Sequence, residues 1–136
     1  MVYKGKYWYG FARTVEIGIS SVGSGSTTEV PIFVAPFRCK VRECLIVPKS
    51  NIVGADTNYM TLAFVNKGGD GSGNATISSL ACTASIGTIS AFDAKSFGAV
   101  SNNNLNEGDV ISFKKAEAGN GANMPDLIAV LKITRR

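Results

Sequence analysis

The sequence predicts an all-β fold: an antiparallel β-sandwich or jelly roll of about eight strands, with an extended N-terminal arm. Three observations lead to this prediction. Apolar residues recur with a period of two in several short runs. Turn-forming residues separate these runs at fairly regular spacing, and glycine alone accounts for 15 of 136 residues. No segment has the pattern of a long helix, so a parallel α/β fold has no room for its crossover helices.

The length fits one domain with one core. A domain of this size buries roughly two-thirds of the surface that its unfolded chain exposes. We therefore expect it to fold without disulfides or a metal. We place the N-terminal arm at residues 1–13 and the sandwich at residues 14–136.

The first two predicted strands lie close to the arm. In residues 14–21, three β-branched residues alternate with polar or small ones, as in a half-buried strand. A Gly-Ser turn at residues 23–26 ends this strand. The second strand covers residues 29–35, where Pro31 favours an edge position or a strand start.

The middle of the chain predicts three more strands. Residues 38–47 form the longest β-prone stretch, which Pro48 ends. In residues 59–66 both the odd and the even positions are mostly apolar. We therefore expect both faces of this strand to be covered. After a Gly-rich loop at residues 67–74, residues 75–83 are predicted to form a short strand.

The last third contains the least regular segment, residues 86–97. Within it, residues 90–96 have the pattern of one or two helical turns, with Ser90 as the N-cap. The final two strands are expected at residues 110–115 and 127–134, each preceded by a turn rich in Gly, Asn or Asp.

The arm is rich in aromatic and basic residues. Tyr and Trp are common anchors of protein interfaces, and this many aromatic side chains are too many for a freely solvated tail. We expect the arm to dock either on its own domain or on a neighbouring subunit, with nucleic acid as a further alternative. The candidate protein-interface residues are Tyr3, Lys4, Lys6, Tyr7, Trp8, Tyr9, Phe11 and Arg13.

The net charge of +4 is mild for a nucleic-acid-binding protein. Much of the excess lies towards the two ends of the chain. These charges are interpreted either as solvated termini or as groups that attract an acidic partner surface.

The three cysteines, Cys39, Cys44 and Cys82, do not predict a disulfide framework, because their number is odd and no secretory signal is recognised. The odd separation of Cys39 and Cys44 predicts opposite faces of a strand. We interpret all three as small buried residues. With no apolar run long enough to span a bilayer, we expect the chain to be cytosolic when made.

The residue types argue against an enzyme. The chain has no histidine, which removes the commonest general base and transition-metal ligand. No Cys-x-x-Cys pair is present, so we expect no metal site and no cofactor. The Gly-rich loop Gly68–Asn74 matches phosphate and calcium loops only weakly. A hydrolase that uses two carboxylates remains an alternative.

A longer pattern resembles a known class of proteins. The segments Pro31–Phe37, Cys39–Pro48, Gly54–Tyr59, Leu62–Gly68 and Gly119–Asp126 occur in an order similar to that of head-decoration (cement) proteins of tailed phages. This resemblance covers residues 29–134 and consists of turn motifs rather than catalytic signatures.

The resemblance implies a sandwich or jelly roll on the outer surface of the virion. Such a protein binds the major capsid protein, often as a homotrimer at threefold positions, and stabilises contacts between capsid subunits. It implies neither membrane nor nucleic-acid partners. The competing interpretation is a receptor- or carbohydrate-binding jelly roll of a fibre or tail, with Trp8 or Tyr59 as an exposed aromatic platform.

Overall fold

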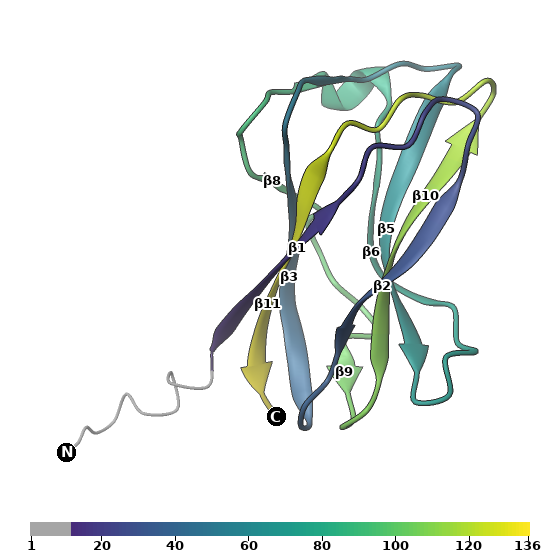
Figure 1. Ribbon diagram of the computed structural model, residues 1–136. Helices are drawn as coiled ribbons and strands as arrows, with labels where there is room; N and C mark the ends of the chain where they lie inside the picture. The colour runs from purple at the N-terminus through teal and green to yellow at the C-terminus, as the bar shows by residue number, and fades with distance from the viewer. Residues whose placement is uncertain (1–11) are drawn as a thin grey trace.

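Two antiparallel sheets face each other in the computed structural model, which describes residues 12–136 (Figure 1). The first sheet has the order β1-β11-β3-β8, and β9 also pairs with β3; the second has the order β2-β10-β5-β6; β4 and β7 form a small ribbon. The prediction of an all-β antiparallel sandwich is confirmed. The strands are β1 (Arg13–Ile19), β2 (Thr28–Val34), β3 (Cys39–Pro48), β4 (Ile52–Val53), β5 (Tyr59–Gly68), β6 (Ala75–Ala81), β7 (Thr88–Ile89), β8 (Lys95–Ser96), β9 (Asn104–Leu105), β10 (Val110–Ala118) and β11 (Leu127–Arg135).

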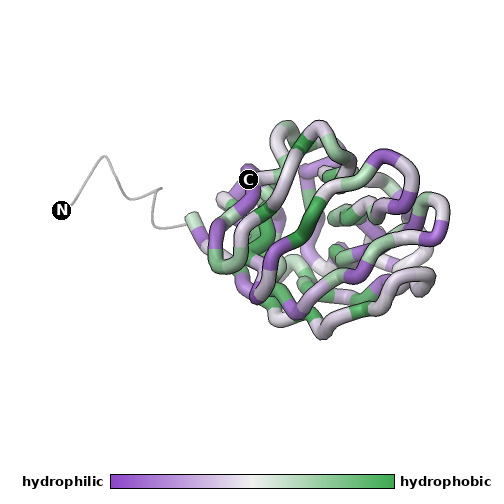
Figure 2. Tube along the Cα trace, turned by 90° about the horizontal axis from the view of Figure 1, so that it is seen from above, coloured by the Kyte–Doolittle hydropathy of each residue, from purple (hydrophilic) through white to green (hydrophobic). Residues whose placement is uncertain are grey.

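The core lies between the inner faces of the two sheets. Phe64 of β5 packs edge-to-face on Phe97 and on Phe113 of β10, with ring centroids 5.1 and 5.2 Å apart. All three side chains are buried. Such aromatic pairs contribute about 0.5–1.5 kcal/mol each beyond the area that they bury. Hydrophobic and hydrophilic residues alternate along much of the trace in Figure 2, as expected for strands with one buried face.

A β-bulge in β3 overturns the predicted placement of the first two cysteines. Opposite Lys132 and Ile133 of β11, the register skips Arg42, so the alternation of β3 shifts by one residue. Cys39 and Cys44 both point into the core as a result, and neither is exposed to solvent. The prediction that they lie on opposite faces was therefore wrong.

The segment between β6 and β10 corrects the predicted helical turns at residues 90–96. A short 3-10 turn, η2 (Ala84–Ile86), occurs earlier in the segment. Around Phe92 the chain instead forms a turn in which the N–H of Asp93 donates to the carbonyl of Ser90 at 3.2 Å. Lys95 and Ser96 then pair with β3. Strand pairing thus prevails over a weak local preference for helix.

Residues 97–103 close one side of the sandwich by bonding to both sheets. The N–H of Phe97 donates to the Cys44 carbonyl at 2.9 Å, and the Asn103 carbonyl accepts from the N–H of Val41 at 2.9 Å. On the other sheet, the N–H of Ser101 donates to the Ile77 carbonyl at 2.9 Å. The opposite side, between β1 and β2, has no equivalent strap among the described residues, where β1 pairs only with β11 and β2 only with β10.

A buried lysine fastens the loop between β1 and β2. Lys115 of β10 is fully buried, and its Nζ donates to the carbonyls of Gly23 and Ser26 at 2.9 and 2.8 Å. It also forms an ion pair with Glu117. The charge and all three donors of the ammonium group are thereby satisfied. In the described part of the chain, no helix is long and apolar enough to cross a membrane.

Candidate functional site

All five arginines of the chain gather at one end of the sandwich. The register of β1 and β11 places Arg13 opposite Ile133, and the register of β3 and β11 places Arg135 opposite Cys39. In Figure 1 the start of β1 and the C-terminal end of β11 lie at the same, lower end of the molecule. The arginine-rich end is defined here as Arg13, Arg38, Arg42, Arg135 and Arg136.

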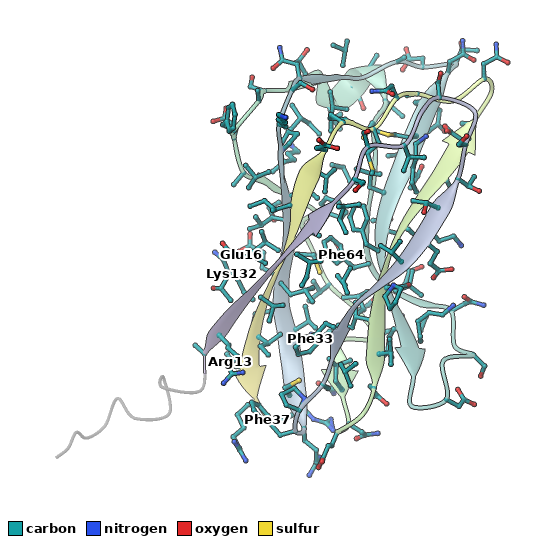
Figure 3. All side chains as sticks on the ribbon, in the orientation of Figure 1. Arg13, Glu16, Phe33, Phe37, Phe64 and Lys132 are labelled. Atoms are coloured by element: carbon teal, nitrogen blue, oxygen red, sulfur yellow. The ribbon has the colours of Figure 1, made fainter. Side chains whose placement is uncertain are left out.

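An aromatic ring orders two of these guanidinium groups. Phe37, in the turn between β2 and β3, is half-buried. Its ring centroid lies 4.5 Å from Cζ of Arg135 and 5.9 Å from Cζ of Arg13. Figure 3 shows Arg13 and Phe37 close together at this end. A guanidinium over a ring face gains about 0.5–1 kcal/mol at an exposed site, so Phe37 holds two cations beside each other despite their repulsion.

Neutral groups orient two more of the arginines. Nε of Arg42 donates to Oγ1 of Thr134 at 2.8 Å, and Nη2 of Arg136 donates to Oδ1 of Asn106 at 3.1 Å. Within the described residues, Arg13, Arg38, Arg42 and Arg136 form no ion pair. Their charge is therefore not neutralised by a carboxylate in this part of the chain. Planar guanidinium groups suit bidentate binding of carboxylates or phosphates.

Several carboxylates elsewhere in the domain are already paired with lysines. Glu29 accepts from Oγ of Ser112 at 2.6 Å and lies 3.4 Å from Nζ of Lys67, and Glu43 lies 3.2 Å from Nζ of Lys132. The hydrogen bond with Ser112 and the Lys67 contact hold the pKa of Glu29 below its ordinary value. For Glu43, a hydrogen bond with Ser96 and then the Lys132 contact lower the pKa in the same way. Such carboxylates are neutralised inside the domain and do not compete for the arginines.

In the Gly-rich loop, the side-chain oxygens of Asp70 and Asn74 are engaged by groups of the loop itself. Oδ1 of Asp70 accepts from the backbone N–H and the hydroxyl of Ser72, at 3.0 and 2.8 Å. Oδ1 of Asn74 accepts from Nζ of Lys67 at 2.9 Å. Residues 12–136 contain no group of three or more His, Cys, Asp or Glu side chains that could hold a metal ion. The hydrogen bonds of Asp70 are those of a turn. Nζ of Lys67 occupies the side-chain oxygen of Asn74 that a bound cation would need.

The three thiols are free and buried. Burial raises the pKa of Cys39, raises that of Cys44 to about 12, and raises that of Cys82 to about 11. At neutral pH they are protonated and behave as small apolar groups.

Of the sequence-predicted interface residues, Arg13 alone lies in the described part of the chain, as the first residue of β1. Its predicted partners Tyr3, Lys4, Lys6, Tyr7, Trp8, Tyr9 and Phe11 lie outside the described residues, so their role stays a prediction.

Sequence reasoning noted Arg135 and Arg136 among the terminal charges but missed Arg38 and Arg42. Arg38 and Arg42 lie far from Arg13 and Arg135 in the sequence, and only the pairing of β1, β11 and β3 brings them together. It also missed Phe92, a residue that is 77% exposed. Because residues 90–96 were predicted to form helical turns, an exposed aromatic ring at residue 92 was not expected.

Comparison with known proteins gives little further guidance. No protein-family model matches the sequence, and no curated protein does. Among solved structures, the chain is similar to the crystal structure of PirA, with 12% identity, a TM-score of 0.39, and coverage of 90% of this chain and 93% of that one. A likeness this distant assigns neither a family nor a function.

Proposed function

We propose that this protein is a structural virion component that binds the outer surface of a phage capsid and stabilises contacts between major capsid subunits. The observation that carries the proposal is the arginine-rich end, where four guanidinium groups form no ion pair within the described residues. A surface of this kind fits an acidic patch on a large partner. The choice of a phage capsid as the partner comes from the resemblance of residues 29–134 to head-decoration proteins.

The strand order supports the same proposal. We interpret the sheets β1-β11-β3-β8 and β2-β10-β5-β6 as a jelly roll, because the long strands alternate between the sheets from β1 to β5 and again from β10 to β11. A fold does not specify a function. A stiff sandwich with short loops is nevertheless suited to a cement protein, whose task is binding without turnover. Several copies in one oligomer would strengthen capsid binding through multivalency.

The test compares two double variants with the same change in charge. R38Q/R42Q removes two exposed arginines from the proposed surface, and K49Q/K114Q removes two exposed lysines from elsewhere. Binding of labelled protein to capsids stripped of their surface proteins is measured by co-sedimentation. We expect R38Q/R42Q to weaken binding by about tenfold or more, since each charged contact is worth more than about 1 kcal/mol, and K49Q/K114Q to weaken it by less than about twofold.

Raising the salt concentration should weaken wild-type binding, because exposed charges are screened. Equal losses in the two double variants would exclude the arginine-rich end as the contact. Wild-type protein that does not bind the capsids would refute the capsid function itself.

Phe92 favours a second candidate function, a receptor- or carbohydrate-binding domain of a phage fibre or tail. Its ring is exposed, and its backbone lies in the left-handed region with φ of 64°. The N–H of Phe92 donates to the Pro48 carbonyl at 2.8 Å, which fixes the turn that presents the ring. An exposed aromatic face suits stacking on a sugar ring. Calorimetric saccharide binding that is abolished by F92A would support this alternative, and its absence would remove it.

A further inference from the structure

The side of the sandwich between β1 and β2 is a groove with strand edges on both walls. The free edges of the two strands flank a cleft of about 300 Å³ whose lining includes Ile17, Ile19, Val22 and Val30. The other side of the sandwich is covered by residues 97–103, as described above. An unpaired strand edge offers a row of backbone N–H and C=O groups to another strand. The groove is therefore shaped for an extended segment.

The inner face of β1 is only partly covered. Val15, Ile17 and Ile19 share this face, but only Ile19 is buried, and the other two are half-buried. On the outer face, Glu16 is exposed and forms no ion pair within the described residues. A strand that completes this edge must bring apolar side chains on one face and a cation on the other.

The segment of chain that joins β1 at Arg13 carries this pattern. With a period of two, Tyr3, Tyr7, Tyr9 and Phe11 fall on the same alternation as Val15, Ile17 and Ile19. Lys4 and Lys6 fall on the same alternation as Glu16. The aromatic segment is defined here as residues 3–11. Apart from Trp8, which falls on the same alternation as the lysines, its two faces match the two faces of the β1 edge.

We propose that the aromatic segment pairs with the free edge of β1 in a second copy of the chain, and that the exchange is reciprocal about a twofold axis. Residues 3–19 of the two copies would then run antiparallel with Phe11 opposite its own symmetry mate. In this register Tyr7 lies opposite Val15 and Tyr3 opposite Ile19, which are aromatic–aliphatic pairs of the favoured kind. On the other face, Lys6 lies opposite Glu16. The contact is isologous and closes as a dimer.

A two-residue turn within one chain would give a different register. The tightest reversal that Gly10 favours is a two-residue turn at Gly10 and Phe11, with glycine in the first position. That turn places Lys6 opposite Val15 and Lys4 opposite Ile17, on the apolar face of β1. A one-residue difference in register moves every side chain to the other face. That turn does not give the register that matches both faces, whereas a second copy reaches it without any turn.

A charge-swap experiment on the full chain tests the proposal. The dissociation constant of the dimer is measured by sedimentation equilibrium for wild type, K6E, E16K and K6E/E16K. Each single swap places like charges opposite each other at two symmetric positions, and we expect it to raise the dissociation constant by roughly tenfold. The double swap restores opposite charges, and its dissociation constant should return to within about threefold of wild type. The matched control is K49E, which changes the charge equally but lies outside the pairing.

The outcomes separate this proposal from the capsid function. A dimer that both single swaps weaken and the double swap restores supports reciprocal exchange. A monomer, a trimer of the kind that the phage resemblance implies, or a dimer indifferent to the swaps overturns it. R38Q/R42Q should leave the dimer intact, because Arg38 and Arg42 lie outside the paired edge of β1.

Discussion

At Gly54 the backbone leaves no room for a side chain. A Cβ atom here would lie 2.0 Å from the carbonyl oxygen of Thr83 and 2.9 Å from that of Gly87. The N–H of Gly54 donates to the same Gly87 carbonyl at 3.0 Å, so the backbone cannot move away without losing a bond. The contact joins the end of β4 to the chain around η2.

We therefore expect Gly54→Ala to lower the free energy of unfolding by about 3 kcal/mol, in the range of overpacked interiors. The control is Gly23→Ala, where no heavy atom lies within 4 Å of the added methyl group; it should change stability by less than about 0.5 kcal/mol. Urea unfolding followed by circular dichroism measures both. Equal stability of the two variants would contradict the close approach at Gly54.

Lys115 is the second residue at which a single change should be costly. Lys115→Met keeps the length of the side chain but removes the ammonium group that donates to Glu117 and to the carbonyls of Gly23 and Ser26. Removing one partner of a buried ion pair typically costs about 3–5 kcal/mol. Lys114→Met, on the exposed face of the same strand, should be nearly neutral. Thermal unfolding of both variants checks this, and similar melting temperatures would refute the fastening role of Lys115.

At the scale of elements, the bulge in β3 sets which side chains enter the core. Skipping Arg42 keeps Val41 and Cys39 on the same face as Cys44 and Ile46. A regular strand would have turned Cys39 and Val41 towards solvent. One inserted residue thus changes the inward set of half a strand.

Deleting Arg42 should therefore be tolerated, because the remaining residues can pair regularly with β11 in the same inward phase. Deleting Leu45 should not be, because it turns Cys39, Val41 and Cys44 out of phase with the rest of β3. The measurement is the reaction of the native thiols with a thiol reagent, which is slow while the cysteines are buried. Rapid reaction in the Arg42 deletion would show that the bulge itself keeps the cysteines buried.

The same elements show how far the sequence predicts this structure. Alternation with a period of two located β1 and β11 to within one or two residues, because one face of each strand is buried. The bulge at Arg42 and the pairing of Lys95 with Ile46 were not predictable, since both depend on a partner strand far along the chain. For the same reason the sequence showed the terminal charges Arg13, Arg135 and Arg136 but not their grouping with Arg38 and Arg42.

For the whole molecule, the ionisable groups determine how the free energy of unfolding depends on pH. We expect it to be nearly constant around neutral pH and to fall at acid and at alkaline pH. The chain has no histidine, so no side chain with an ordinary pKa near neutrality titrates. For Glu117, burial opposes ionisation, but hydrogen bonds from Lys115 and Ala122 and the Lys115 charge outweigh it and hold its pKa below 4.5. The thiols of Cys44 and Cys82 have their pKa values raised to about 12 and about 11, above 9.0, by burial.

The direction of each pKa shift determines whether its contribution to stability is lost at acid or at alkaline pH. Glu117 contributes stability above its unfolded pKa, which is lost as the pH falls through its lower folded value. The thiols contribute stability below their unfolded pKa, which is lost as the pH rises from about 9 towards their folded values. We expect the free energy of unfolding, measured in urea, to be nearly constant from about pH 6 to pH 8 and to fall on either side. C44A/C82A should flatten the fall at alkaline pH, and an unchanged slope there would contradict it.

The neighbouring positions of the first and last strands have one more consequence. Because β1 begins beside the end of β11, a short peptide can join the two without crossing the sandwich. The Gly-rich loop between β5 and β6 is then a natural place for new termini, since the side chains of Asp70 and Asn74 bond within the hairpin. Such a circular permutant would keep every strand neighbour of the native sheets while moving both chain ends away from the arginines.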